Sequence, residues 1–113
     1  MQNKVILVGR LVKDVEVKST ENAKVGYIKI AVPRSYKNKN GEIETDFIDV
    51  TCFSLTAETA ATYAHKGDLV GISGSLQNSS YEKDGETIYK TSVVAESISF
   101  LAKHKENETE EKN

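Results

Sequence analysis

Apolar and polar side chains alternate with a period of two along several short segments, and this pattern constrains the fold more than any other feature. Residues 25–32 (VGYIKIAV) place Ile28 and Ile30 on one side and mostly polar or aromatic side chains on the other. Residues 5–12 are largely apolar on both sides, which is typical of a strand covered on both faces. Further strand patterns cover residues 46–53, 69–76 and 88–101. The pattern predicts a mainly β protein.

Turn residues separate and bend these predicted strands. Residues 40–41 (Asn-Gly) and 84–85 (Asp-Gly) have the composition of tight hairpin tips. Pro33 cannot donate a ladder hydrogen bond, so regular pairing should weaken there. Gly71 and Gly74 lie inside a strand pattern and suit a bulge or a sharp bend. A polar stretch at residues 19–24 is expected to turn the chain.

One segment has the composition of a helix. Residues 56–66 (TAETAATYAHK) are mostly good helix formers. Thr56 is the candidate N-cap, with Glu58 in the first turn. Lys66 would lie in the last turn and Gly67 at the C-cap. We therefore expect a single short helix between the third and fourth strands.

The length and the element order together predict the fold class. The 113 residues suffice for one compact domain. Three strands, one helix and two further strands indicate an all-β fold with one helix, a five-stranded Greek-key barrel of the OB type over residues 1–102. An open meander under the helix would leave exposed edges. Residues 103–113 have no apolar anchor and are predicted to form a disordered tail.

Charge is segregated along the chain. The net charge is −2, but residues 1–40 carry nine Lys or Arg against three Asp or Glu, whereas residues 41–102 carry three against ten. A slightly acidic molecule can therefore still present a basic surface.

Compartment signals are few. No apolar run approaches the roughly 18 residues that would span a membrane, and the N-terminus lacks the small-residue cleavage site of a secretory signal. We therefore expect no membrane partner and a cytoplasmic location, bacterial or in the host cytoplasm if the protein is phage-encoded. Cys52, the only cysteine, lies on the apolar face of a strand and is expected in the core.

Catalytic and metal signals are weak. His65 lies at the end of the predicted helix and His104 in the tail, so neither can pair with a nucleophile. The acidic residues Glu42, Glu44, Asp46 and Asp49 lack the spacing of a calcium loop and indicate a solvated face. We expect no catalysis, no metal and no cofactor.

The segment DFIDVTCF, residues 46–53, has aromatic side chains on its polar side. If Ile48, Val50 and Cys52 face the core, Phe47 and Phe53 face solvent. Exposed rings beside basic residues are typical of surfaces on which unpaired bases stack. The candidate stacking residues are Tyr36, Phe47, Phe53 and Tyr81, and the candidate phosphate partners are Arg10, Lys29, Arg34, Lys37 and Lys39.

Four segments carry a family resemblance: NKVILVGRLVKD, AVPRSYKNKNGEIETDFIDVTCF, AETAATYAHKGDLVGISGSL and VVAESISFL, in that order over residues 1–102. They resemble the bacterial-type single-stranded DNA-binding protein family, including its phage, mobile-element and short accessory members. The resemblance implies an OB-fold and single-stranded DNA wrapped over stacking aromatics during replication, recombination or repair. By position, the stacking rings of the family fall on the four aromatic candidates. It also implies a homotetramer, with a dimer as the alternative, in which Ile6 and Val8 of the first strand lie at the subunit interface.

Some positions depart from the family pattern. Ser75 and Ser79 stand where basic residues are usual in the family. Ser54 and Leu55 follow Phe53, where a basic residue is common. Because each lost phosphate contact reduces the salt slope of binding by about one unit, we expect weaker and less salt-sensitive binding than in a typical member.

The C-terminal tail also departs from the family. KENETEEKN is acidic but lacks the apolar tip with which family tails dock replication and repair proteins, so such docking is not expected. An OB-fold adaptor of the primosomal type, using the aromatic face for a protein partner, stays open as the alternative function.

Overall fold

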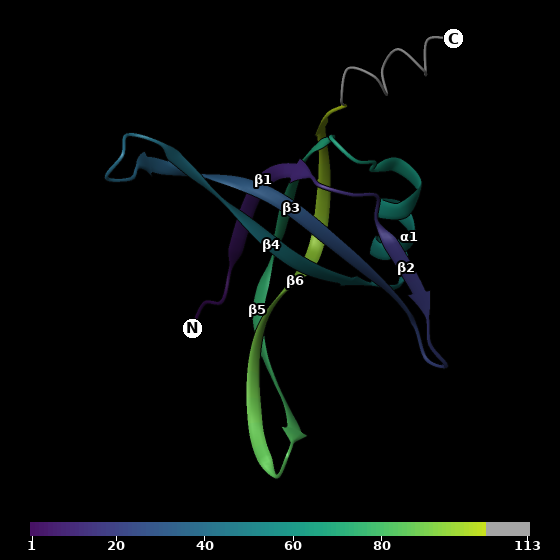
Figure 1. Cartoon of the computed structure of the whole chain (residues 1–113). Helices are drawn as coiled ribbons and strands as arrows, with labels where there is room; N and C mark the ends of the chain where they lie inside the picture. The colour runs from purple at the N-terminus through teal and green to yellow at the C-terminus, as the bar shows by residue number, and fades with distance from the viewer. Residues whose placement is uncertain (104–113) are drawn as a thin grey trace.

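The structure, a computed structural model, describes residues 1–103 as six strands and one helix (Figure 1). The tail prediction for residues 103–113 falls, apart from Lys103, outside the described residues. The elements are β1 (Val5–Leu11), β2 (Glu16–Ser19), β3 (Lys24–Lys37), β4 (Ile43–Phe53), α1 (Ser54–Tyr63), β5 (Leu69–Lys83) and β6 (Glu86–Ala102).

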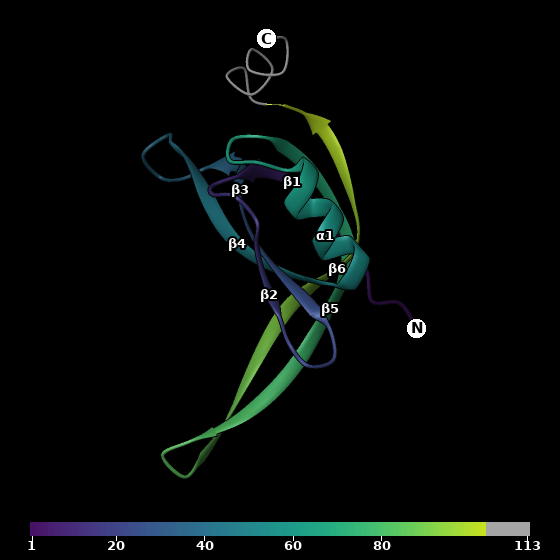
Figure 2. The same ribbon diagram turned by 90° about the vertical axis from the view of Figure 1, so that its right-hand side faces the viewer.

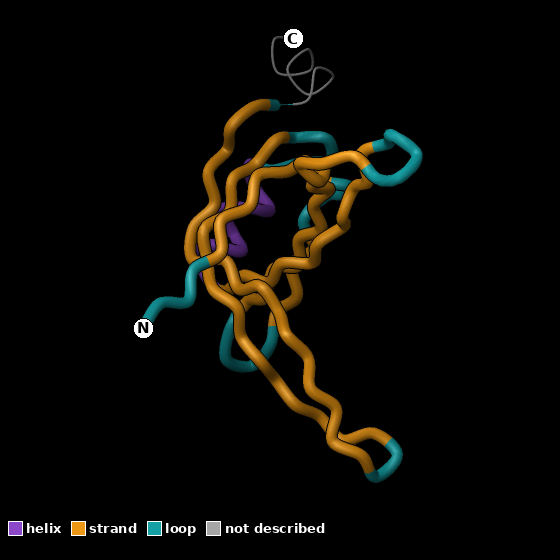
Figure 3. The backbone as a smooth tube through the Cα atoms, turned by 90° about the vertical axis from the view of Figure 1, so that its left-hand side faces the viewer, coloured by secondary structure: helices purple, strands orange, loops and turns teal. Residues whose placement is uncertain are grey.

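Five of the strands close into a barrel. The sheet order is β1-β5-β6-β4-β3-β2, and β1 also pairs with β3, which joins the two ends of the five-strand set. The β4–β6 contact is parallel, with Val50 opposite Val93, whereas the other pairings are antiparallel. Figure 3 shows the strands curving around the ring with the helix behind it. The predicted five-stranded OB barrel, with its helix between the third and fourth barrel strands, is confirmed.

The sixth strand, β2, was missed in the sequence. It continues the course of β1 after a short break and pairs with the start of β3, with Lys18 opposite Val25. The strand is only four residues long and exposed throughout. Its sequence therefore carries little of the apolar–polar alternation that indicates a strand. The expected turn at residues 19–24 is present, and the Thr20 amide donates to the Ala23 carbonyl at 2.8 Å.

Alternating side chains fill the barrel as expected. Ile30, Val50 and Cys52 are almost completely buried, with Ile28, Val70 and Ile72 in the same core. Helix α1 adds Ala57 and Ala60, whose small side chains let the helix lie close to the strands. Cys52 is therefore a core residue as predicted, and burial raises the pKa of its thiol.

The helix begins earlier than predicted. It starts directly after β4, at Ser54, and Phe53 rather than Thr56 is the N-cap residue. No side-chain hydrogen bond caps this end, and no acidic residue lies in the first turn, so the roles predicted for Thr56 and Glu58 are wrong. The polypeptide passes from strand to helix without a loop, and Ser54 at this junction adopts a positive φ of 53°.

The helix also ends earlier than predicted, at Tyr63 rather than at residue 66. Beyond the C-cap residue Ala64, the backbone amides find partners outside the helix, beginning with His65, whose amide donates to Oδ2 of Asp68 at 3.0 Å. The Lys66 amide donates to Oδ1 of Asp14 at 2.8 Å, and the Gly67 amide donates to the Leu11 carbonyl at 2.8 Å. Lys66 and Gly67 thus belong to a turn held against β1, and the C-cap predicted at Gly67 is wrong.

Two hairpin arms project from the barrel, and their strands are longer than predicted. The arm formed by β3 and β4 turns at residues 38–42, and the arm formed by β5 and β6 turns at residues 84–85. Both predicted tips are confirmed, with positive φ at Gly41 and Gly85. Beyond the core both faces of an arm meet solvent, so alternation no longer marks the strand. In Figure 2 both arms extend toward the side of the barrel that carries β3 and β4.

Irregular pairing occurs close to the positions expected. The β3–β4 register shifts between Pro33 and Lys37, and the β5–β6 register shifts between Ser73 and Gly74. A Cβ on Gly74 would collide with the Val94 carbonyl. Gly71 has no such constraint, because the atom nearest to a Cβ at that position would be 3.5 Å away.

Candidate nucleic-acid interface

The outer face of β4 carries the two rings on which the sequence interpretation depended. Phe47 is 61% exposed and Phe53 is 45% exposed, whereas Val50 and Cys52, on the opposite face, are buried. The predicted exposure of both phenylalanines is therefore correct. Six residues of extended chain separate the rings by about 20 Å.

Cationic side chains share this outer face. In the antiparallel ladders, Phe47 lies opposite Ala31 and Ala31 lies opposite Arg10, so all three point to the same side. The Arg10 guanidinium donates from Nη1 to the Gly67 carbonyl at 3.0 Å. Nζ of Lys29 lies 3.9 Å from Oδ1 of Asp49 across the β3–β4 ladder. Two of the candidate phosphate partners thus flank Phe47 and the middle of β4.

The remaining aromatic candidates lie on the arms. Tyr36 is exposed near the end of β3, with Lys37 beside it and Lys39 in the following turn. Tyr81 is exposed on β5, three residues before the tip at Asp84. Because both arms extend to the side of β3 and β4 (Figure 2), they border the face that carries Phe47.

Arg34 is held by carboxylates within its own arm. Its Nε and Nη2 donate to the two oxygens of Asp46 at 3.1 and 3.0 Å, and Nη1 donates to Glu44 at 2.6 Å. The hydrogen bond from Arg34 lowers the pKa of Asp46 below its usual range, opposed by partial desolvation, and the same pair raises the pKa of Arg34. A phosphate at Arg34 would have to replace these acceptors.

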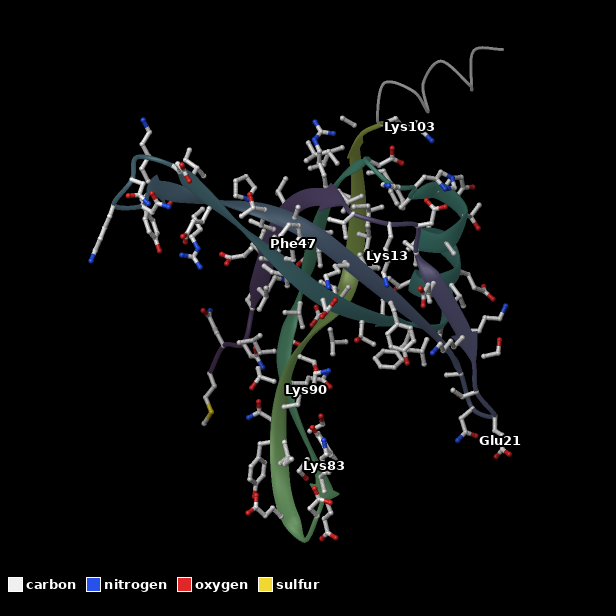
Figure 4. All side chains as sticks on the ribbon, in the orientation of Figure 1. Lys13, Glu21, Phe47, Lys83, Lys90 and Lys103 are labelled. Atoms are coloured by element: carbon white, nitrogen blue, oxygen red, sulfur yellow. The ribbon has the colours of Figure 1, made fainter. Side chains whose placement is uncertain are left out.

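A groove of about 590 Å³ runs over the outer face of β3 and β4. Phe47, Tyr27 and Thr51 line it from the sheet. Lys13 and Lys18 line it from the side of β2, and Lys90, Thr91 and Ser92 line it from β6. Figure 4 shows Lys13, Phe47 and Lys90 on the side of the barrel that faces the viewer, with Lys83 farther along the β5–β6 arm.

Several groove residues were not among the sequence candidates. Tyr27 could have been found, because it alternates outward from Ile28 in the same strand pattern as Lys29. Lys18 lies on β2, which is exposed throughout and was not recognised as a strand. Lys90 reaches the groove only through the pairing of β6, which has no local signal. In that pairing Lys90 lies opposite Ser79. Ser79 is one of the two β5 serines that replace the basic residues usual in the family, so Lys90 places a positive charge beside that position.

Among residues 1–103 there is no cluster of three metal-binding side chains, and no helix in this part of the chain is long and apolar enough to cross a membrane. Of the acidic residues near the β3–β4 arm, Glu44 and Asp46 pair with Arg34, and Asp49 pairs with Lys29. Most of the carboxylates near this arm therefore form ion pairs with Arg34 or Lys29.

The fold and the face define a class of protein. A closed OB barrel with exposed rings on one face, bordered by hairpin arms and lysines, has the architecture of OB-folds that bind oligonucleotides. Comparison with known sequences agrees with this class. The profile of the single-strand binding protein family matches residues 2–101, and the chain belongs to this family.

Bacterial relatives support the assignment over most of their length. The chain is 46% identical over 103 residues to single-stranded DNA-binding protein B of Bacillus subtilis (strain 168), covering 89% of this chain and 91% of the relative. It is 48% identical over 103 residues to single-stranded DNA-binding protein 2 of Staphylococcus aureus (strain Mu50 / ATCC 700699), covering 89% and 73%. The single-stranded DNA-binding protein of Staphylococcus epidermidis (strain ATCC 12228 / FDA PCI 1200) is 39% identical over 114 residues, covering 100% and 87%. These relatives are named as DNA-binding proteins, and the resemblance inferred from the sequence is confirmed.

Proposed function

We propose that this protein binds single-stranded DNA with little dependence on sequence and protects it during replication, recombination or repair. One observation carries the proposal: in a member of this family, Phe47 and Phe53 project from a strand whose other face fills the core. Stacking of a base on such a ring contributes about 1–3 kcal/mol, whatever the base. Tyr36 and Tyr81 extend the stacking surface onto the two arms.

Phosphate contacts follow the rings. Arg10 and Lys29 lie on the same face as Phe47, and Lys37 and Lys39 lie on the β3–β4 arm. These side chains neutralise the backbone of the bound strand and release counterions. Arg34 joins them only when a phosphate replaces its carboxylate partners.

The mechanism is passive, and neither a cofactor nor a catalytic step is needed. Stacked bases are turned toward the protein, so their pairing edges are unavailable to a complementary strand while the complex lasts. The affinity is set by the number of rings and cations that one strand reaches together, which favours long substrates over short ones.

We further propose a homotetramer, with a dimer as the alternative, assembled partly through β1 in the cytoplasm. Ile6 is 71% exposed in the isolated chain, and Val8 is also exposed. Ser73 and Gly71, their partners on β5, are small, so the outer face of β1 presents a shallow apolar strip. A second copy of the same strip would remove these side chains from water.

The affinity should be lower and less salt-sensitive than in a typical family member, because Ser54 and Ser75 provide no charge. Lys90, opposite Ser79, offsets one of the missing contacts. The slope of log K against log salt should therefore be shallower, by about one unit for each missing contact. A slope as steep as that of the Bacillus subtilis relative, measured with the same oligonucleotide, would contradict this.

Titration with oligothymidines of increasing length tests the function. We expect length-dependent quenching of tyrosine fluorescence, since the chain has five tyrosines and no tryptophan. Native mass spectrometry with and without a long oligothymidine reports the subunit number and the ligand in one experiment. No response to poly(dT) at low salt would overturn the proposal and favour the protein-binding adaptor.

A further inference from the structure

Tyr27 is an aromatic residue on the proposed DNA face that the sequence candidates did not include. It is 41% exposed on β3, whereas the neighbouring Ile28 is buried in the core. The ladder places Tyr27 opposite Thr51 of β4, so its ring points to the same side as Phe47 and Phe53. Tyr27 and Phe47 both line the 590 Å³ groove.

The position of Tyr27 along the sheet divides the interval between the two phenylalanines. Its partner Thr51 lies four residues from Phe47 and two from Phe53 on the same strand. At the strand rise these offsets correspond to about 13 Å and 7 Å. A single strand running from Phe47 to Phe53 therefore passes Tyr27 before it reaches Phe53.

Lys18 lies over the Tyr27 ring. Its ammonium is 5.5 Å from the ring centroid, within the range of a cation–π contact. On β2, Lys18 lies opposite Val25, which in turn lies opposite Phe53. Lys18 has no carboxylate within ion-pair distance among the described residues, whereas its neighbour Glu16 lies 3.5 Å from Lys13. The charge of Lys18 is thus available to an anion.

We propose that Tyr27 and Lys18 form a further nucleotide-binding position between Phe47 and Phe53, in which a base stacks on Tyr27 and Lys18 contacts a phosphate of the same strand. The inference rests on the proposed function and adds one ring and one cation to it. A base that takes the ring face covered by Lys18 displaces the ammonium from the ring. The long lysine side chain then carries its charge to the nearby backbone, at the cost of a cation–π contact that is weak at an exposed site.

The first test truncates the Tyr27 ring and compares the loss of binding with that caused by truncation of Phe47. Binding of a fluorescently labelled oligothymidine is measured by anisotropy, which does not depend on tyrosine emission. We expect Tyr27→Ala to weaken binding by about 5-fold or more, toward the lower end of the range for a stacked base, and Tyr27→Phe to bind like the unchanged protein. Tyr63→Ala serves as the matched control, because it removes an exposed tyrosine on α1 outside the groove and should bind normally.

The outcomes separate this inference from the proposed function. If the unchanged protein binds and Phe47→Ala is weakened but Tyr27→Ala is not, the Tyr27 position is refuted and the function stands. If the unchanged protein does not bind, the proposed function itself fails. Circular dichroism and thermal unfolding establish that each variant is folded before its affinity is compared.

The second test does not require truncation of the ring. Lys18→Met keeps most of the side-chain length and removes the charge, so we expect the salt slope of binding to fall by about one unit. Lys24→Met is the matched control. Lys24 follows the β2–β3 turn that contains Glu21, and it pairs with Glu58. The substitution therefore removes a charge that is already neutralised and should change the salt slope less. Equal slopes for Lys18→Met and the unchanged protein would refute the phosphate contact.

Tyr27→Phe should also lower the amplitude of the tyrosine quench at unchanged affinity, and an unaltered amplitude would refute stacking at Tyr27.

Discussion

Along β4, side chains that fill the core alternate with the rings proposed to bind DNA. Val50 and Cys52 are buried and hold the barrel together, whereas Phe47 and Phe53 face outward. Phe47 keeps most of its surface exposed in the folded chain and Phe53 keeps almost half, so these rings contribute less to folding than the fully buried side chains do. Under the proposed function, stability and binding therefore depend on alternate residues of one strand, so a substitution should change one without the other.

Phe53→Ala tests this separation. We expect the variant to lose about 1–3 kcal/mol of binding free energy for oligothymidine and to keep its fold, because the ring is outside the core. Fluorescence anisotropy gives the affinity, and thermal unfolding gives the stability. Loss of folding in this variant would contradict the prediction, because it would show that the Phe53 ring belongs to the hydrophobic core.

Arg34 illustrates how carboxylates can withhold a cation from a ligand. Asp46 and Glu44 together carry more charge than the one guanidinium that they contact. The double variant Glu44→Gln/Asp46→Asn should bind DNA more tightly and with a salt slope steeper by about one unit, because the freed Arg34 adds a phosphate contact.

A matched control distinguishes this local effect from a change in net charge. Glu21→Gln/Glu96→Gln removes the same number of negative charges from exposed positions on other parts of the surface, and Figure 4 places Glu21 at the β2–β3 turn, far from the β3–β4 arm. Salt titrations of both double variants give the comparison. Identical slopes would mean that Arg34 stays unavailable to the strand.

At the scale of elements, the arms depend on bends in long strands. β5 and β6 run from the barrel into an arm, and the register shift between Ser73 and Gly74 lies within the barrel part of this pair. There the β5 backbone approaches the Val94 carbonyl so closely that no side chain fits at Gly74. The bend from which the arm carrying Tyr81 extends thus begins at this bulge.

Gly74→Ala should destabilise the protein by about 1–3 kcal/mol, as expected when an added methyl group forces the backbone to shift. Ser75→Ala is the control, since the neighbouring position already carries a Cβ and should change stability little. Urea unfolding monitored by circular dichroism measures both. An unchanged midpoint for Gly74→Ala would show that the pairing with β6 adjusts without cost.

At the scale of the whole molecule, the segregation of charge in the sequence is partly cancelled by folding. Lys24, Lys29 and Arg34 from the basic segment pair with carboxylates from the acidic one. Within residues 1–103, Lys37 and Lys39 make no such pair. The basic surface is therefore smaller than the basic segment, and among residues 1–103 the cations outside ion pairs include Lys37 and Lys39 on the β3–β4 arm and Lys18 and Lys90 at the groove.

Assembly belongs to the same scale. Ile6→Asp should reduce the oligomer proposed for this protein to smaller species, because a carboxylate on the outer face of β1 would be buried without a partner at the subunit contact. Leu55→Asp, at an equally exposed apolar residue on α1, is the control and should leave assembly unchanged. Native mass spectrometry at matched concentration gives the subunit number. The same mass for Ile6→Asp and the unchanged protein would place the contact elsewhere.

The amino-acid sequence by itself determined which side chains face the core and which face water. The alternation of Ile48, Val50 and Cys52 with Phe47 and Phe53 depends only on the period of a strand and on the hydrophobic effect, so the exposed rings were predicted correctly. The two hairpin tips were equally local, because their glycines adopt backbone angles that few other residues favour.

Only the tertiary structure decided where the helix ends, which lysines border the groove and which acids hold Arg34. The Lys66 amide, expected in the last turn of the helix, instead donates to Asp14, 52 positions away in the sequence. Lys18 meets Tyr27, and Lys90 meets the face of Phe47, through strand pairings that no local period encodes. The contacts of Lys66 and Lys90 join residues distant in the chain and depend on the closed barrel, whereas Lys18 and Arg34 meet their partners across adjacent strands whose register local alternation does not fix.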